Sequence, residues 1–332
     1  MRSTSLIGLG LGLVAAVVFA SATAGPLFVR FLLLFITPLA IALAGLGWGW
    51  RTAVLAGAVG TALVFVFSTP AVAAAFALTQ AAPMAVLTYL AMLSRPADEA
   101  GHLSDADDAP VLDWYPPGRV VIWAAVLAGI MAIGTLALLG NDLDQLRRAL
   151  GDVIKQALPA GMSEGQPPVQ LNEAEIYALA DVALAILPGA SALSWMSSLL
   201  FNLWLAGRVT LASGQLARPW PDLSAITYPA GTPLAFGVLL LGLMLPGYPS
   251  LVASAMAGGL FLAYLLLGLA IIHYTTRAQP WRPFALWALY GSLIVVNIWI
   301  WIVVAILGLA ETVLHLRARS SAPPAPPLHP NS

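Results

Sequence analysis

The chain of 332 residues contains no cysteine, and charged side chains make up only 9% of it. The absence of cysteine excludes disulfide bonds, thiolate nucleophiles and metal sites with thiolate ligands. The net charge of −1 leaves no surplus of lysine and arginine to neutralise phosphates. A nucleic-acid partner is therefore not expected.

Enzyme motifs are missing as well. The sequence holds no HExxH zinc motif, no GxxxxGK[ST] phosphate-binding loop and no GxSxG nucleophile motif. The run GLGLG, with Gly8, Gly10 and Gly12, belongs to an apolar helical segment and lacks the preceding strand of a nucleotide-binding fingerprint. We therefore expect a protein that is not an enzyme, with no catalytic residue, no cofactor and no metal.

Apolar residues, by contrast, are abundant: they make up 60% of the chain, and the mean hydropathy is +0.89. This composition is typical of an integral membrane protein. A membrane span needs about 20 apolar residues. Nine segments approach that length, at residues 6–22, 27–46, 52–67, 71–92, 120–139, 178–206, 225–245, 251–272 and 283–309. The expected fold is an all-α, polytopic membrane helix bundle of nine spans, forming one domain over residues 1–319.

The closing segment is ambiguous because it contains two aromatic clusters with a polar residue between them. Trp281 and Trp287 mark its start, whereas Trp299 and Trp301 follow Asn297 in its middle. Aromatic side chains of this kind prefer the membrane interface. The segment is therefore either one span with a polar interruption or a hairpin of two short helices, and the hairpin would raise the count to ten.

The first segment imitates a secretory signal, because Arg2 precedes a short apolar core that ends in Ala20, Ser21 and Ala22. The chain nevertheless continues at once into another apolar segment, as a polytopic protein does. We expect the first helix to stay uncleaved.

Arginines are distributed unequally between alternate loops. With the amino terminus inside, the opposite side holds Arg30, Arg147, Arg148 and Lys155, whereas the cytoplasmic loops hold Arg2, Arg51, Arg95, Arg119, Arg208, Arg218, Arg277 and Arg282. An excess of positive residues marks the cytoplasmic loops of bacterial membrane proteins. We expect a multi-pass protein of the bacterial inner membrane, surrounded by the lipid bilayer, with its amino terminus in the cytoplasm. A hairpin at the end would bring Arg317 and Arg319 to the same side, so the charge bias favours it.

The segment 94–118 is acidic and poor in apolar residues, so it is expected to be a flexible cytoplasmic loop. Asp105, Asp107 and Asp108 lack the glycine and the ligand spacing of a calcium loop, which favours a solvated acidic run. The Pro-rich tail at 320–332 is expected to be disordered.

The segment 141–170 has an amphipathic beginning. Leu146, Leu150 and Val153 share helical spacing, while Asp144 and Arg147 occupy other positions. Such a helix is expected to lie along the outer membrane surface without crossing it. The alternative is an external helix that packs on its own loop.

The stretch DWYPPGRV enters the fifth apolar segment. Trp114 and Tyr115 favour the headgroup layer, and Arg119 is placed to meet cytoplasmic phosphates. These three residues are therefore expected to form an interfacial anchor that fixes where the span begins.

Polar side chains recur on one face of the sixth segment. Ser191, Ser194, Ser198 and Asn202 follow one another at steps of three, four and four residues, so a helix places them together. This polar stripe is interpreted either as one wall of a substrate pocket, offering hydroxyl and amide groups, or as small residues that allow close helix packing.

Asp181 precedes the stripe in the same apolar segment. A carboxylate inside the membrane is costly unless it is paired, protonated or hydrated, so Asp181 is a candidate for binding a cation or proton. Alternatively, it lies near the outer headgroups.

His273 is interpreted as an interfacial histidine. Glu311 and His315 are one helical turn apart, which would suit a metal site or a proton relay. The polar end of a cytoplasmic helix explains them more simply.

Several short motifs carry a family resemblance. They are WYPPGR at 114–119, GLGWG at 45–49, NLWLAGR at 202–208, GLAIIH at 268–273 and LGLAETVLHLRAR at 307–319. In their order and spacing, from about Leu6 to Arg319, they resemble the YybS-like family of predicted bacterial membrane proteins, a family of unknown function. Its distant similarity to the substrate-binding subunits of energy-coupling-factor transporters implies a small-solute or transport-related role.

Two functions are therefore expected as alternatives. The first is a protein that binds or helps to transport a small solute, for which an ATPase partner is possible because the chain itself has no nucleotide site. The second is a membrane scaffold or assembly partner without enzymatic activity, which would use the acidic loop and the Pro-rich tail as its contact surfaces.

Overall fold

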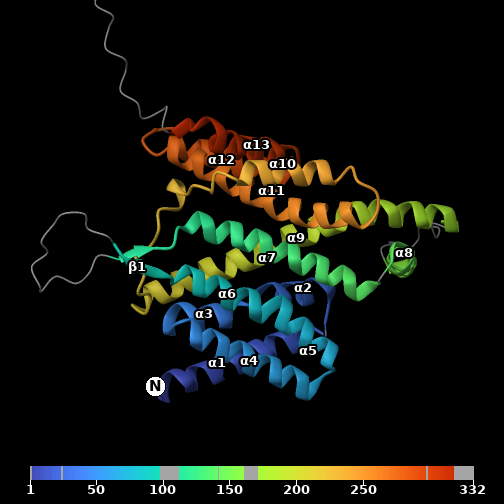
Figure 1. Ribbon diagram of the computed structural model, residues 1–332, viewed down its shortest axis with the longest axis horizontal. Helices are drawn as coiled ribbons and strands as arrows, with labels where there is room; N and C mark the ends of the chain where they lie inside the picture. The colour runs from blue at the N-terminus through green and yellow to red at the C-terminus, as the bar shows by residue number, and fades with distance from the viewer. Residues whose placement is uncertain are drawn as a thin grey trace, which may run out of the picture.

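A computed structural model describes residues 2–23, 25–97, 112–140, 142–160, 171–296 and 298–317. These residues form an elongated bundle whose helices run mostly along one direction (Figure 1). The expected all-α fold is thereby confirmed. The Pro-rich tail at 320–332 and the acidic positions Asp105, Asp107 and Asp108 lie outside the described residues.

The elements run in the order α1 (Arg2–Ser21), α2 (Leu27–Ile36), α3 (Leu39–Trp48), α4 (Trp50–Phe67), α5 (Pro70–Phe76), the π-helix η1 (Ala77–Ala81), α6 (Ala82–Ala91), β1 (Ser94–Pro96), β2 (Leu112–Trp114), α7 (Pro117–Leu139), α8 (Leu143–Ala160), α9 (Glu173–Ala212), the 3-10 helix η2 (Leu223–Ala225), α10 (Thr232–Gly242), α11 (Tyr248–Thr275), α12 (Arg282–Val295) and α13 (Ile298–Leu314).

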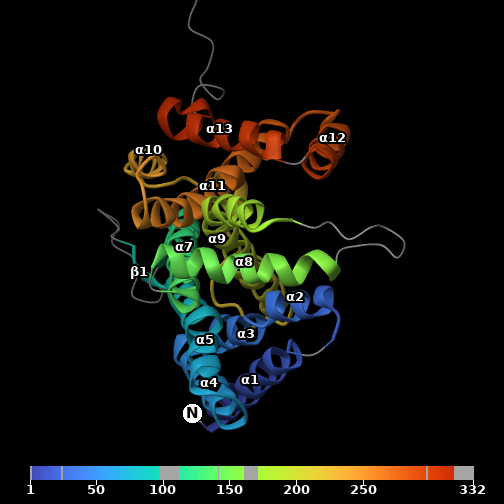
Figure 2. The same ribbon diagram turned by 90° about the vertical axis from the view of Figure 1, so that its right-hand side faces the viewer.

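The amino-terminal part of the chain, α1 to α6, forms one side of the bundle (Figures 1 and 2). The expected second span is interrupted between α2 and α3, where Pro38 has no N–H to donate to the helical ladder. α1 and α4 approach closely because Gly12 has no side chain: a Cβ there would lie 2.6 Å from the carbonyl oxygen of Ala56. Close backbone approach at small residues is typical of helix packing in membranes.

α11 is the central helix of the remaining part of the bundle, and it packs against α7, α9 and α13 (Figure 2). The crossing with α13 depends on two glycines. A Cβ at Gly268 would lie 1.9 Å from the carbonyl oxygen of Val304, and one at Gly308 would lie 2.0 Å from that of Tyr264. Any larger residue at either position would force the two backbones apart.

Within the described ranges, seven helical segments are long and apolar enough to cross a membrane. Three further apolar helices are shorter: α10 has 11 residues, α12 has 14 and α13 has 17. At about 1.5 Å per residue, α10 covers roughly half of a hydrocarbon layer about 30 Å thick. The expected count of nine spans is therefore not confirmed. Composition alone placed the seventh span at 225–245, where Pro229 and Gly231 precede a much shorter helix.

The ambiguous closing segment is a hairpin of two helices and not one span. Arg282, at the start of α12, borders the same cavity as Ser224, and Arg317, just after α13, donates to the carbonyl oxygen of Ser224 at 2.8 Å. The chain therefore leaves and returns to the same end of the bundle.

The two ends of segment 94–118 are ordered, so the expectation of a flexible loop is wrong for them. β1 and β2 pair as antiparallel strands, with Arg95 opposite Asp113 and an ion pair of 2.9 Å between their side chains. Residues 98–111 lie outside the described ranges. The ribbon projects from the end of the bundle at which α7 begins (Figure 1).

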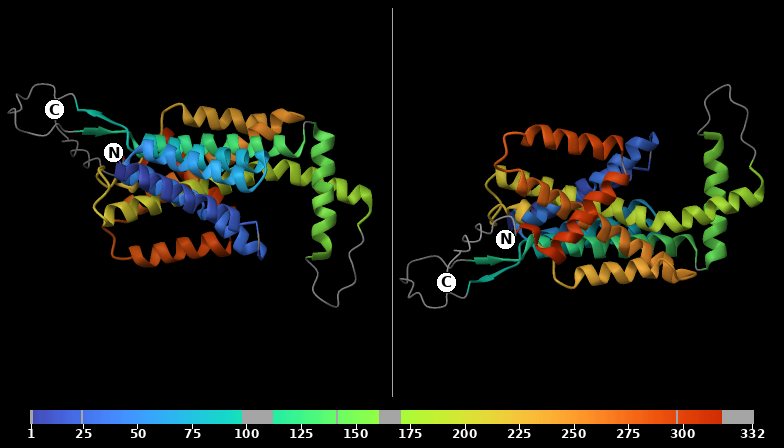
Figure 3. Two further views of the ribbon diagram at one scale, coloured as in Figure 1. Left: turned by 90° about the horizontal axis from the view of Figure 1, so that it is seen from below. Right: turned by 90° about the horizontal axis from the view of Figure 1, so that it is seen from above.

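At the opposite end, α8 lies nearly perpendicular to the bundle axis (Figure 3). Leu146 and Leu150 are buried against Ala180 and Leu184 of α9, so α8 packs on a helix of the bundle and not on its own loop. Its expected position along the outer membrane surface stays a prediction. Val153, expected on the same apolar face, is 57% exposed and does not join this cluster. The remainder of the predicted segment, 161–170, is not among the described residues.

Candidate functional site

A cavity of about 920 Å³ lies between α7, α9, α11 and α12. We call it the α9/α11 cavity. The volume lies within the range of small-molecule binding sites, about 300–1,000 Å³. Its walls are mostly apolar and aromatic, formed by Leu46, Val120, Val121, Leu200, Phe201, Leu203, Trp204, Leu216, Leu262, Leu266, Leu269 and Ala270.

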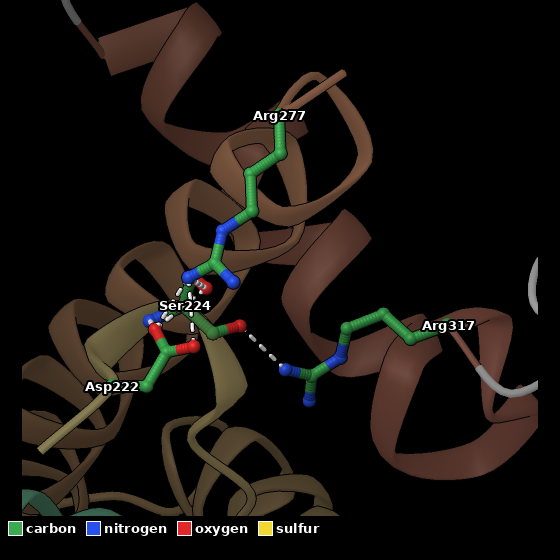
Figure 4. Close-up of polar contacts among 4 residues, drawn as sticks. All are labelled: Asp222, Ser224, Arg277 and Arg317. Carbon is green, nitrogen blue, oxygen red and sulfur yellow. Dashed lines mark hydrogen bonds and ion pairs between the residues drawn. The ribbon is translucent and has the colours of Figure 1, made fainter.

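Polar groups gather where the cavity meets the segment between α9 and α10. Asp222 caps η2 by accepting hydrogen bonds from the backbone N–H of Ser224 at 3.0 Å and from its hydroxyl at 2.8 Å. Arg277, just after α11, donates to both carboxylate oxygens of Asp222, at 2.6 and 2.7 Å, and to the Ser224 hydroxyl (Figure 4). The hydrogen bonds from Arg277 and then from Ser224 lower the pKa of the Asp222 carboxyl to about 2, and Asp222 raises the pKa of Arg277.

Arg317 holds the same segment from the far side. Its guanidinium donates to the backbone carbonyl oxygens of Ser224 at 2.8 Å and Ile226 at 2.7 Å, and to a carboxylate oxygen of Glu311 at 2.8 Å. Arg317 and Glu311 are only 9% and 7% exposed. Arg317 thereby ties the segment around Ser224, which we call the cavity mouth, to the end of α13. Figure 4 shows the contact between Arg317 and Ser224.

Two other arginines line the cavity without a carboxylate partner in the described part of the chain. Arg218 donates to the backbone carbonyl oxygen of Ala91 at 2.8 Å and lies 5.9 Å from the Trp114 ring, and burial lowers its pKa. Arg282 borders the cavity near His273, which shares a 2.8 Å hydrogen bond with Tyr290 of α12. Arg277 is balanced by Asp222, so the three arginines and one carboxylate that line the cavity have a net charge of +2.

The polar stripe predicted on α9 does not line the α9/α11 cavity. Ser198 and Asn202 are buried, and both donate to the backbone carbonyl oxygen of Phe35, at 2.6 and 2.7 Å. Ser194 and Ser191, one and two turns before Ser198, are half-buried. Ser197, one position off the stripe, is the serine of α9 that borders the cavity.

Asp181 lies away from this stripe, at the end of the bundle occupied by α8. Its carboxylate accepts a 2.6 Å hydrogen bond from Nε of Arg147, and its side chain is 51% exposed. The pair raises the pKa of Arg147. α9 has 40 residues, about 60 Å of helix, so roughly half of it exceeds a hydrocarbon layer about 30 Å thick. This geometry fits the alternative in which Asp181 lies beyond the apolar layer. Whether Asp181 or the stripe binds a substrate stays a prediction.

The three anchor residues are grouped at the start of α7. Trp114 ends β2 beside Arg218, and the Tyr115 hydroxyl accepts a 3.3 Å hydrogen bond from the indole N–H of Trp123. The guanidinium of Arg119 lies 5.9 Å from the Tyr115 ring. The stretch therefore joins the ribbon, α7 and the cavity mouth, and its interfacial role stays a prediction.

No local sequence pattern marks the residues that shape the cavity mouth. Arg218, Asp222 and Arg277 are separated by up to 59 positions, and no spacing rule connects them. Gln80 was also missed: it is fully buried within the π-helix η1, and its Oε1 atom has no hydrogen-bond partner among the described residues. A π-helix often marks a functional position, and the polar pair Thr79–Gln80 in an apolar run was the available signal. Glu311 pairs with Arg317 and not with His315, whose side chain is exposed.

The seven long apolar helices and the buried interhelical polar contacts define a multi-pass helical membrane protein. The chain belongs to the family described as "Predicted membrane protein (DUF2232)", whose model matches residues 13–312. The expected family is thereby confirmed. No curated protein and no solved structure matches the chain, so the distant similarity to energy-coupling-factor subunits stays a prediction.

Proposed function

We propose that this protein binds a small amphipathic molecule in the α9/α11 cavity and acts, without enzymatic activity, in solute binding or transport. The observation that carries the proposal is the two-part lining of the cavity. Apolar side chains such as Leu200, Phe201 and Leu266 form its body, and Arg218 and Arg282 border it as well. Such a lining suits a molecule with an apolar part and a polar end.

The proposed orientation places the cavity mouth at the cytoplasmic face of the bacterial inner membrane. Arg95, Arg218, Arg277 and Arg317 all belong to the end of the bundle that carries the β1–β2 ribbon. Arg147 and Arg148 belong to α8 at the opposite end, where they are accompanied by acidic residues. An arginine-rich cytoplasmic side, which includes the amino terminus, accords with the positive-inside rule.

A scaffold function is the second candidate, and one observation favours it. α12 buries none of its own residues in the bundle, and Phe284, Trp287 and Ile294 are each about four-fifths exposed. Such a helix can face lipid or a neighbouring membrane protein. The scaffold would not require an occupied cavity, so the two candidates differ in what the cavity contains.

Mass spectrometry of the protein released from nanodiscs tests the binding proposal. We expect the wild-type protein to retain a co-purified small molecule and Leu266→Trp, which fills the cavity wall, to lose at least nine-tenths of it. Val252→Trp is the matched control, because Val252 is an exposed residue of the same helix that does not border the cavity. Equal retention in all three proteins, or an empty wild-type cavity, would leave the scaffold as the better function.

A further inference from the structure

The cavity has two different cationic groups at its polar end. Arg277 is neutralised, because Asp222 contacts it through both carboxylate oxygens. Arg218 and Arg282 have no such partner in the described part of the chain. A guanidinium stays protonated even where burial is substantial, so each contributes a full positive charge. We therefore expect the negative charge that balances Arg218 and Arg282 to come from the molecule that occupies the cavity.

Arg218 is held in place before any ligand arrives. Its hydrogen bond to the carbonyl oxygen of Ala91 and the aromatic face of Trp114 leave its remaining N–H groups as donors. A donor that is already positioned loses less conformational entropy on binding than a free surface arginine does. A partly buried guanidinium also interacts with an anion more strongly than one in bulk water.

We infer that the α9/α11 cavity binds the phosphate monoester of a membrane lipid, with Arg218 and Arg282 contacting the phosphate and the apolar wall contacting the chain. The inference rests on the proposed function and specifies its ligand. A phosphate monoester carries a charge of about −1.5 to −2 at neutral pH, which matches two guanidinium groups. A carboxylate or a phosphodiester carries only about −1 and leaves one arginine unbalanced.

The apolar wall identifies the other half of the ligand. Leu200, Phe201, Trp204, Leu262, Leu266 and Leu269 present side chains along α9 and α11. Each methylene group transferred from water to such a wall stabilises the bound state, whereas inorganic phosphate cannot use this surface. A ligand that satisfies both halves of the lining must carry its phosphate on an apolar chain.

Calorimetric titration of the protein in phosphatidylcholine nanodiscs tests this inference with n-octyl phosphate as the probe. n-Octanoate, n-octanol and inorganic phosphate are titrated in parallel, and empty nanodiscs provide the blank. We expect octyl phosphate to bind saturably at one site, octanoate at least tenfold more weakly, and octanol and inorganic phosphate without saturation. This ranking is expected because only octyl phosphate combines the charge of a phosphate monoester with an apolar chain.

The variants separate the headgroup from the cavity. Arg218→Gln and Arg282→Gln are each expected to raise the Kd of octyl phosphate about tenfold to a hundredfold, because a charge-assisted hydrogen bond is lost. Arg148→Gln makes the same charge change on α8, at the opposite end, and is expected to leave the Kd unchanged. Leu266→Trp is expected to abolish binding of the probe.

Each other outcome overturns the inference in a distinguishable way. If octanol binds as tightly as octyl phosphate and both arginine variants bind normally, the headgroup assignment fails while the cavity proposal stands. If inorganic phosphate binds as tightly, the site is one for a free anion. If octyl phosphate binds but Leu266→Trp has no effect, the cavity is not the site, and the proposed function fails with the inference. If no probe binds, the phosphate assignment is wrong, whatever co-purifies in the cavity.

Discussion

The side-chain amide of Asn202 in α9 donates a 2.7 Å hydrogen bond to the backbone carbonyl oxygen of Phe35 in α2. Ser198 donates to the same oxygen at 2.6 Å. Phe35 lies at the end of α2, where the carbonyl groups have no continuing helix to bond. Two residues of the predicted stripe therefore satisfy a backbone group at the break before Pro38, in a surrounding where an unpaired carbonyl is costly.

Replacement of Asn202 by leucine tests this relationship. We expect Asn202→Leu to reduce the free energy of unfolding by about 0.6–1.7 kcal/mol, the range of interhelical hydrogen bonds in membranes. Unfolding in mixed micelles with increasing denaturing detergent measures it. Ser197→Ala is the control, because the Ser197 hydroxyl donates within its own helix to Leu193. A stable Asn202→Leu variant that has lost the bound molecule would instead assign the stripe to a ligand.

The buried pair between Glu311 and Arg317 gives a larger expected effect. Glu311→Ala leaves the guanidinium of Arg317, which is 9% exposed, without its carboxylate. Loss of one partner of a buried ion pair generally costs about 3–5 kcal/mol. We expect a clear fall in thermal stability and faster proteolysis between α9 and α10, because Arg317 also holds the carbonyl groups of Ser224 and Ile226.

Val313→Ala is the matched control for that variant, since Val313 lies two residues away and is 61% exposed. It is expected to change the melting temperature little. Equal melting temperatures for Glu311→Ala and the control would show that the cavity mouth does not depend on the ion pair.

Much of the fold could be predicted because the relevant signals are local. A long apolar run predicts a helix in a membrane whatever its neighbours are, and α1, α4, α7 and α11 follow the expected segments closely. The periodicity of Leu146 and Leu150 likewise predicted a helix with one buried face. Hydropathy predicted too long a helix at α10, because the apolar residues there extend beyond the helix itself.

The site was not predictable because it depends on contacts between distant parts of the chain. Arg277 and Asp222 are 55 positions apart, and Asn202 and Phe35 are 167 apart. Periodicity correctly placed Ser198 and Asn202 on one face, but it could not indicate whether a cavity or another helix lies opposite. The burial of the Gln80 side chain depends on the π-helix η1, which the sequence did not predict.

Leu146→Ala tests how α8 is attached. Leu146 is fully buried against α9, and a buried Leu→Ala change generally costs about 2–5 kcal/mol. We expect faster amide hydrogen exchange across α8 (Leu143–Ala160) and little change in α11. Val153→Ala, at a 57% exposed position of the same helix, is the control. Unchanged exchange in Leu146→Ala would mean that membrane contact, and not α9, holds the helix.

Single cysteines test the orientation, and the absence of native cysteine makes the labelling unambiguous. In intact cells, a membrane-impermeant thiol reagent is expected to label Arg148→Cys on α8 and not Arg95→Cys on β1. The Arg95 side chain is 78% exposed, so its protection would reflect the membrane and not burial. After the cells are opened, both positions should react. Ready labelling of Arg95→Cys in intact cells would invert the proposed topology.

The Asp222–Arg277 pair is expected to make stability depend on pH in the acidic range. The folded-state pKa of Asp222, about 2, lies below the ordinary value of 3.8, chiefly because Arg277 and Ser224 donate hydrogen bonds to the carboxylate. A depressed pKa contributes stability that is fully present above the ordinary value and is lost as the pH falls toward 2. Wild-type protein and Asp222→Asn should therefore differ in melting temperature above about pH 4 and converge as the pH approaches 2. Asp152→Asn, at an exposed position of α8, is expected to track the wild type throughout. A difference between wild type and Asp222→Asn that stays constant down to pH 2 would show that the carboxylate stabilises the segment through its shape and not through its charge.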